Sequence, residues 1–177
     1  VVLAASAIES ARLVRPLSAT WADTATALRY EPIVTVYLRS AGTALPAPML
    51  ALRSDSTSPA QFAFDRGRLG GPPGLLAFVI SGAQHWVDAG AAVTLAATRR
   101  QAESALAGLL RGPLETVQVV TEKRATFRCT PNLRRPAMRI AARLCAAGDH
   151  VDGPYPSTLE GAVRSGIAAA RNLFDDR

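Results

Sequence analysis

The residues best suited to bind a ligand lie close together near the end of the chain, in the stretch AGDHVDGPYPSTLEG at positions 147–161. An apolar run, Leu144–Ala147, precedes the carboxylate of Asp149, and a helix is expected to start after Ser157. The first N–H groups of a helix lack intrahelical partners and carry partial positive charge, so they bind phosphate without a lysine. Asp149 would repel phosphate but could accept hydrogen bonds from a sugar-alcohol chain. FAD contains both groups.

The helix after this loop has a well-defined start in the sequence. Ser157 is predicted to cap it, and Glu160 to reach back and complete a capping box. Gly161 and Gly166 allow another backbone to approach closely, and Arg164 is expected to be solvated. The apolar positions recur at helical spacing: Leu159, Ala162, Val163, Ile167, Ala170 and Leu173. That stripe alone favours a terminal helix packed on a sheet, whereas the preceding AGD and PYP favour a phosphate site.

Composition limits the other classes of function. The 177 residues are 49% hydrophobic, enough for one ordinary core and a small additional unit. The net charge of +6 is scattered along the chain, with no run of more than two adjacent bases. Nucleic-acid binders carry dense basic blocks interleaved with aromatic residues, so we expect no nucleic-acid partner. No apolar stretch approaches the length of a membrane-spanning helix.

The cysteines and histidines predict no metal site. Cys129 and Cys145 have neither metal nor redox spacing, and we expect both to be buried free thiols. His85 and His150 are too few and too far apart to define a zinc site. Asp65 and Glu122 are expected to be exposed strand residues, and the sequence identifies no general acid.

The elements that must position the loop predict an α+β fold. Hydrophobic patterns predict strands at 1–5, 30–40, 49–52, 61–64, 75–81, 114–127 and 144–147, and helices at 7–17, 91–111 and after 157. The middle strands are joined by loops, which favours an antiparallel or mixed sheet with helices, whereas the last strand and helix are typical of a parallel layer. No helix follows GRLGGPPG, so we interpret it as a loop rather than a phosphate motif.

AGDHVDGPYPSTLEGAVRSGIAAA resembles the C-terminal FAD-binding motif of the flavin-containing amine oxidase and desaturase superfamily. AGD with PYPSTLEGAVRSG is similar to the form in bacterial hydroxysqualene dehydroxylases, also named squalene-associated FAD-dependent desaturases. LRYEPIVTVYL, PMLALRSD, AQFAFDRGRLGG and EKRATFRCTP resemble other segments of that family in the same order. The resemblance implies a C-terminal portion of a longer protein. Residues 1–17 would be the end of an FAD-domain strand and the connecting helix. Residues 18–140 would form the substrate-binding region, and residues 141–177 would form the C-terminal strand, loop and helix of the FAD-binding domain.

The same resemblance implies roles for individual residues. Asp149 would be the partner of the ribityl hydroxyls. The residues implied near the cofactor are Gly148, Asp149, Thr158, Leu159, Glu160 and Gly161, and those implied on the substrate side are Arg124, Thr126, Phe127 and Pro131. His150-Val151 departs from the aromatic-threonine pair expected after AGD, and Ala4–Ser6 departs from the usual proline-bearing turn.

The implied activity is removal of a hydroxyl from a hydrophobic C30 alcohol by reduced FAD. Alternatives are a phytoene-desaturase-like or amine-oxidase-like flavoenzyme, or a non-enzymatic α+β binding module. The resemblance implies that an N-terminal dinucleotide-binding half, as a partner, would supply the GxGxxG fingerprint that these 177 residues lack. We expect these residues alone to lack turnover, to hold FAD weakly and to self-associate. The implied location is the cytoplasm or the inner face of the membrane. The implied substrate is a hydrophobic isoprenoid.

Overall fold

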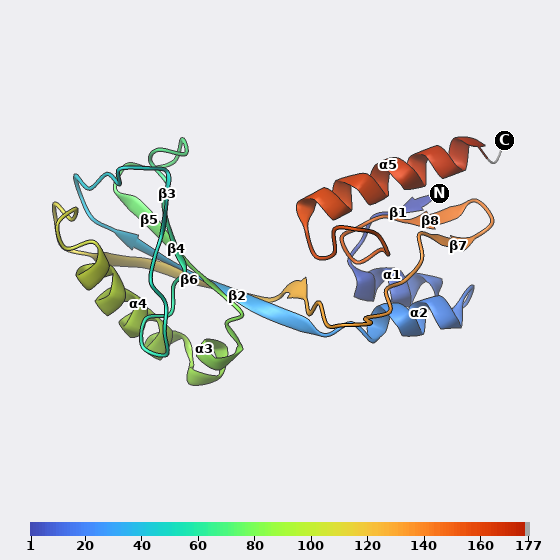
Figure 1. Ribbon diagram of the computed structural model, residues 1–177, viewed down its shortest axis with the longest axis horizontal. Helices are drawn as coiled ribbons and strands as arrows, with labels where there is room; N and C mark the ends of the chain where they lie inside the picture. Colours follow the sequence, from blue (N-terminus) through green and yellow to red (C-terminus); the bar gives the residue numbers. More distant parts are fainter. Residues whose placement is uncertain (176–177) are drawn as a thin grey trace. The chain divides into compact units, whose positions relative to one another are not determined.

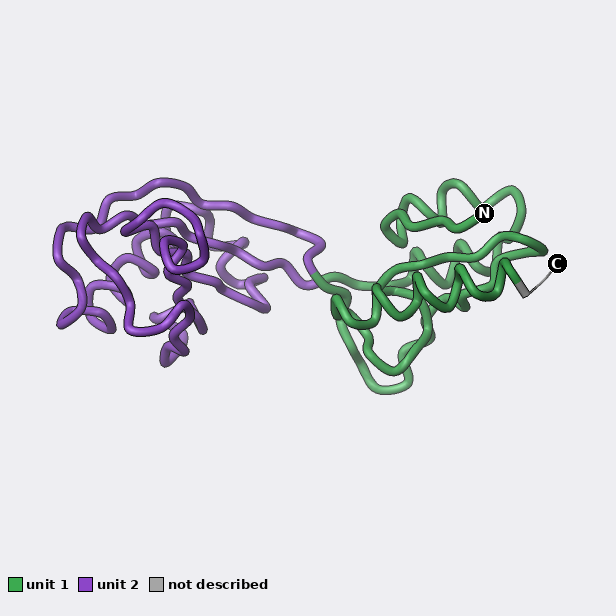
Figure 2. The backbone as a smooth tube through the Cα atoms, turned by 90° about the horizontal axis from the view of Figure 1, so that it is seen from above, with its two compact units in different colours: residues 1–30, 126–177 green, residues 31–125 purple. Residues whose placement is uncertain are grey.

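The computed structural model describes residues 1–175, which form two compact units. One unit combines residues 1–30 with the chain from Thr126 onward, and the other comprises Glu31–Ala125 (Figure 2). The two ends of the chain therefore build one unit together. The roles assigned to residues 1–17, 18–140 and 141–177 are not tested by this division and stay predictions.

The inserted unit is built on a five-stranded sheet with the order β3-β4-β5-β2-β6 (Figure 1). The strands are β2 (Tyr30–Arg39), β3 (Met49–Ala51), β4 (Phe62–Asp65), β5 (Leu75–Ser81) and β6 (Glu115–Phe127). The pairs β3–β4, β4–β5 and β2–β5 are antiparallel. This confirms the predicted α+β class with an antiparallel or mixed sheet.

One face of that sheet forms the core of the inserted unit. Alternate residues of β2 are buried together with Phe78 and Ile80 of β5, since side chains on a strand alternate between faces. The unit also contains α3 (Gln84–Ala89) and α4 (Ala91–Ala105). Leu106, just after α4, is buried in the same core. Helix α4 ends six residues before the predicted end at Arg111, and the sequence patterns missed α3.

Asp65 corrects an expectation about exposed strand carboxylates. Its side chain is 2% exposed, and Oδ2 accepts a hydrogen bond of 2.9 Å from the N–H of Leu45. Oδ1 accepts a second, of 3.2 Å, from the N–H of Arg68. Asp65 therefore anchors two turns of the backbone. Glu122 is exposed, as expected.

The unit formed by the chain ends has a smaller sheet with the order β1-β8-β7. Its strands are β1 (Val2–Leu3), β7 (Arg139–Ala141) and β8 (Leu144–Ala146). Strands β1 and β8 are parallel, and Val2 pairs with Cys145 although they lie at opposite ends of the sequence. Cys145 is buried as predicted, but Cys129 is exposed because it lies in the irregular chain after β6.

Three helices complete this unit: α1 (Ala7–Val14), α2 (Ala19–Thr26) and α5 (Leu159–Asp175). Trp21 of α2 packs with residues of α1 in a shared apolar cluster, and Ala169 of α5 packs against Cys145 and Ala147. Figure 1 shows α5 running along the small sheet. No helix among residues 1–175 is long and apolar enough to cross a membrane.

Candidate functional site

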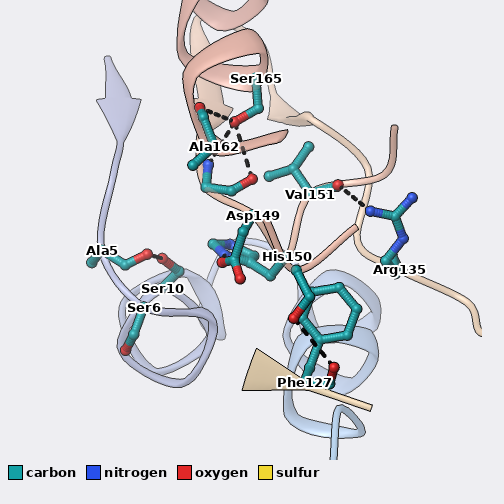
Figure 3. Close-up of polar contacts among 12 residues, drawn as sticks. Ala5, Ser6, Ser10, Phe127, Arg135, Asp149, His150, Val151, Ala162 and Ser165 are labelled. Atoms are coloured by element: carbon teal, nitrogen blue, oxygen red, sulfur yellow. Dashed lines mark hydrogen bonds and ion pairs between the residues drawn. The ribbon is translucent and has the colours of Figure 1, made fainter. Parts of the chain in front are cut away.

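The loop between β8 and α5 is tied to the helix by one serine. The N–H of Gly148 donates to Oγ of Ser165 at 2.8 Å, and that hydroxyl lies 3.0 Å from the Gly148 oxygen and 2.8 Å from the Ala162 oxygen (Figure 3). Ser165 thus fixes the residue immediately before Asp149. The sequence analysis missed it, although a serine inside an otherwise small and apolar helical segment is a usable signal.

Gly148 is required by the imidazole that follows it. A Cβ at Gly148 would lie 2.5 Å from Cε1 and 2.6 Å from Nδ1 of His150, closer than Cβ atoms approach other atoms. The expected close approach at Gly148 is therefore present, but the group that approaches is His150. Contact of Gly148 with a cofactor stays a prediction.

His150 is buried beneath the loop, with 3% of its surface exposed. Its ring meets Trp21 in a T-shaped arrangement, with centroids 6.4 Å apart. Nδ1 lies 3.8 Å from Oδ1 of Asp149, and Nε2 has no hydrogen-bond partner among residues 1–175. The side chain of Asp149 is 40% exposed, so its carboxylate remains accessible.

Thr158, rather than Ser157, caps α5. The hydroxyl of Thr158 accepts from the N–H of Gly161 at 3.0 Å and donates to the Tyr155 oxygen at 2.8 Å. Ser157 has a positive φ of 57°, and its hydroxyl donates to the Phe127 oxygen at 3.2 Å. The predicted capping box is wrong because a contact distant in sequence engages Ser157.

The first turn of α5 also packs against the loop. A Cβ at Gly161 would lie 2.0 Å from the Tyr155 oxygen, so the predicted close approach of backbone is present here. Glu160 pairs with Arg164 at 2.5 Å rather than with the backbone, and this hydrogen bond raises the pKa of the Arg164 guanidinium. The guanidinium carbon also lies 4.8 Å from the centre of the Tyr155 ring. Arg164 is exposed as predicted, but it is held in place.

Two N–H groups at this helix start are available to a ligand. Within the described part of the chain, the N–H groups of Leu159 and Glu160 make no hydrogen bond, whereas Thr158 satisfies the next one. Both residues are exposed, Leu159 at 89%. The loop therefore presents an accessible carboxylate, and the helix presents unpaired donors.

The implied substrate-side residues have different environments. Phe127 is buried near Trp21, and its carbonyl oxygen accepts a hydrogen bond from the Ser157 hydroxyl. Thr126 is half-buried and Pro131 is exposed. Arg124 belongs to the inserted unit, where it is exposed. Of these four residues, the structure joins only Phe127 directly to the loop.

The second face of the large sheet carries a band of half-exposed apolar side chains. Cross-strand register puts Phe62 opposite Val79, and Phe64 opposite both Met49 and Ala77. The rings of Phe62 and Phe64 have centroids 6.4 Å apart. Met49 is 48% exposed and Phe62 36%, so this face offers apolar contact area to a ligand or partner.

Comparison with known proteins identifies the family. The sequence profile of flavin containing amine oxidoreductases matches residues 1–174. The chain belongs to this family. The resemblance drawn from the terminal motif is thereby confirmed.

The chain is also similar to curated proteins over part of its length. Over 67 residues the chain is 45% identical to hydroxysqualene dehydroxylase from Sinorhizobium fredii, a match covering 36% of this chain and 16% of that protein. Over 56 residues it is 50% identical to hydroxysqualene dehydroxylase from Zymomonas mobilis, covering 30% of this chain and 14% of that protein. These matches span about a sixth of each relative or less.

A solved structure shows the same fold. The chain is similar to an oxidoreductase from Methanosarcina mazei, with a TM-score of 0.66 and 13% identity over 96% of this chain and 42% of that one. At this level of identity the likeness concerns the fold alone.

This amine oxidoreductase chain offers groups suited to two parts of an FAD molecule. FAD contains a hydroxylated chain joined to a pyrophosphate, and the chain offers an exposed carboxylate for the first and unpaired N–H groups for the second. Asp149, Leu159 and Glu160 would hold it. The side chain of Thr158 caps the helix, and its predicted place near the pyrophosphate stays a prediction.

Proposed function

We propose that this chain is the C-terminal part of an FAD-dependent oxidoreductase that converts hydroxysqualene to squalene. The observation that carries the proposal is the accessible Asp149 carboxylate beside the open start of α5, in a chain of the flavin-containing amine oxidoreductase family. The partial matches to two hydroxysqualene dehydroxylases support the choice of reaction.

In this proposal the residues of the chain bind and orient the cofactor. The Asp149 carboxylate accepts hydrogen bonds from the ribityl hydroxyls, and the N–H groups of Leu159 and Glu160 donate to the pyrophosphate. Ser165 holds the loop in register with the helix through Gly148. Reduced FAD, when bound, would supply the hydride that replaces the hydroxyl, which leaves as water after gaining a proton.

The proposed substrate is a long hydrocarbon with one polar group. The apolar band of Met49, Phe62, Phe64 and Val79 supports this substrate class, because transfer of a hydrocarbon from water onto such a face is favourable in proportion to the area covered. An aromatic and aliphatic surface also suits a flexible chain that offers few hydrogen bonds. We propose this band as part of the isoprenoid-binding surface.

Helix α5 supports the proposed N-terminal dinucleotide-binding partner. Leu159, Val163 and Ile167 lie at helical spacing and are all exposed, whereas Ala169 of α5 is buried. An apolar stripe of this kind stays in water only at a cost. We propose that the dinucleotide-binding part of the protein covers it, and that these residues self-associate when that part is removed.

We also propose peripheral contact with an anionic membrane surface. The chain from Arg128 to Gly148, within the unit formed by the chain ends, contains several arginines and no acidic residue. Leu13 and Leu17 in the same unit are exposed at 50% and 68%. Basic side chains attract anionic headgroups, and exposed leucines insert among them, which suits an enzyme whose substrate dissolves in lipid.

The test uses the whole protein that carries these residues. Purified protein is loaded with FAD, the flavin is reduced under anaerobic conditions, and hydroxysqualene is added in detergent. We expect squalene to form with stoichiometric oxidation of the flavin, measured by gas chromatography and by visible absorbance. Binding of FAD with no squalene, but with turnover of phytoene or of an amine, would replace the proposed reaction. Absence of any flavin binding would overturn the proposal.

A further inference from the structure

His150 combines deep burial with an incomplete set of hydrogen bonds. Buried polar side-chain atoms in proteins almost always have a partner, so an exception calls for an explanation. Here Nε2 has none among residues 1–175, and Nδ1 lies 3.8 Å from Oδ1 of Asp149, just beyond hydrogen-bond range. This imidazole contacts the loop that carries the proposed ribityl ligand.

The packing of the imidazole determines which of its nitrogens lies near the Asp149 carboxylate. Nδ1 lies on the side of the ring that contacts Gly148, where a Cβ would come within 2.6 Å of it. Trp21 meets the imidazole at an interplanar angle of 80° and helps to fix its orientation. Nδ1 is therefore the nitrogen near the Asp149 carboxylate, whereas Nε2 is covered by protein.

This arrangement indicates which nitrogen of a neutral imidazole carries the proton. A neutral histidine has one N–H donor and one acceptor nitrogen. A proton on Nε2 would bury a donor without an acceptor, whereas a proton on Nδ1 points a donor towards a carboxylate. The second arrangement leaves only an acceptor lone pair unsatisfied.

We propose that His150 is a positioning residue for Asp149, acting as the neutral tautomer with its proton on Nδ1. Its N–H donates to one carboxylate oxygen and leaves the other free for a ribityl hydroxyl. The gap closes by a rotation of the partly exposed Asp149 side chain that moves the oxygen by about 1 Å. The inference rests on the proposed function, since it concerns the residue proposed to hold FAD.

A hydrogen-bond donor suits this position. The carboxylate would lie near a pyrophosphate that also carries negative charge, and a hydrogen bond to an ionised acceptor is stronger than one between neutral groups. His150 thereby stabilises the ionised carboxylate and fixes its direction.

Three substitutions separate this role from simple packing. His150→Asn places an amide N–H near the position of Nδ1, His150→Gln places it nearer Nε2, and His150→Phe keeps the ring without a donor. In the whole protein, we expect the FAD dissociation constant to rise about tenfold or more in the Phe and Gln variants, the range for a lost hydrogen bond to a charged group. The Asn variant should stay within about threefold of wild type.

The tautomer gives a readout that does not depend on activity. Spectra of the FAD-loaded protein with ¹⁵N-labelled histidine, in which the His150 signals are identified by their loss in a variant, should show the proton on Nδ1. A proton on Nε2, or equal FAD affinity in the Asn and Gln variants, would overturn the inference. If the Phe variant fails to fold, the Asn and Gln pair and the spectrum still decide. Wild-type protein that binds no FAD would instead refute the proposed function, and tight FAD binding unaffected by all three substitutions would refute only the role of His150.

Discussion

The close packing of the first turn of α5 against the loop makes Gly161 the most informative glycine to change. In Gly161→Ala the new Cβ would lie 2.0 Å from the carbonyl oxygen of Tyr155 and 3.3 Å from Oγ1 of Thr158. The first contact is with backbone, so the loop or the helix must move. Gly166→Ala in the same helix is the matched control, because its Cβ would meet no atom within 4 Å.

The two substitutions should have opposite effects on the stability of this region. Alanine in a helix interior makes the folded state more stable than glycine does by about 0.5–1 kcal/mol, and Gly166→Ala should show this increase in stability. Overpacking typically costs about 1–3 kcal/mol, and an overlap of this size belongs near the upper end. We therefore expect Gly161→Ala to lower the free energy of local opening by about 2 kcal/mol, and the two variants to differ by about 3 kcal/mol.

Amide hydrogen exchange measures this difference where it arises. Peptides covering the loop and the first turns of α5 should exchange more than tenfold faster in Gly161→Ala than in wild type, since about 1.4 kcal/mol corresponds to a factor of ten. Gly166→Ala should be as protected as wild type or better. Equal protection in the two variants would refute the packing described for Tyr155 and the helix start.

Two further substitutions test the roles of charged residues. Arg164→Gln should change FAD affinity by less than about threefold, because Arg164 is exposed and its ion pair with Glu160 contributes little to stability. A larger loss of affinity in an FAD titration would mean that the Arg164 side chain helps to hold the phosphates. Asp65→Ala should lower the free energy of unfolding by about 1–3 kcal/mol, because the buried N–H of Leu45 loses its acceptor; an unchanged denaturation midpoint would contradict that role.

Local sequence patterns predicted the elements whose hydrophobic period is long and clear. The strand expected at 30–40 is observed as Tyr30–Arg39, and that expected at 75–81 has the predicted bounds. Both are rich in apolar and β-branched residues, and their alternation sets which side chains reach the core. Helix α2 was missed because its eight residues include three threonines and form a weak pattern.

Contacts between distant residues account for the errors at the site. Ser157 has the right spacing from Glu160 for a capping box, yet it bonds to Phe127, thirty residues away in the sequence. The apolar stripe of α5 was expected to pack on a sheet, and Leu173 does so beside Ala169, whereas Leu159, Val163 and Ile167 are exposed. Neither His150 nor Ser165 was assigned a contact with the loop, because such contacts depend on how the loop returns over the helix.

The central claim is that Asp149 and the start of α5 bind FAD, and one titration tests it directly. The whole protein that carries these residues is prepared without FAD and titrated with it, as wild type, as Asp149→Ala and as Glu122→Ala. The last variant is the control, because it removes an exposed carboxylate from the inserted unit. Loss of a hydrogen bond to a charged group should weaken binding by about 1.5–3 kcal/mol in Asp149→Ala, while Glu122→Ala binds like wild type. Equal FAD affinity in all three proteins would contradict the claim.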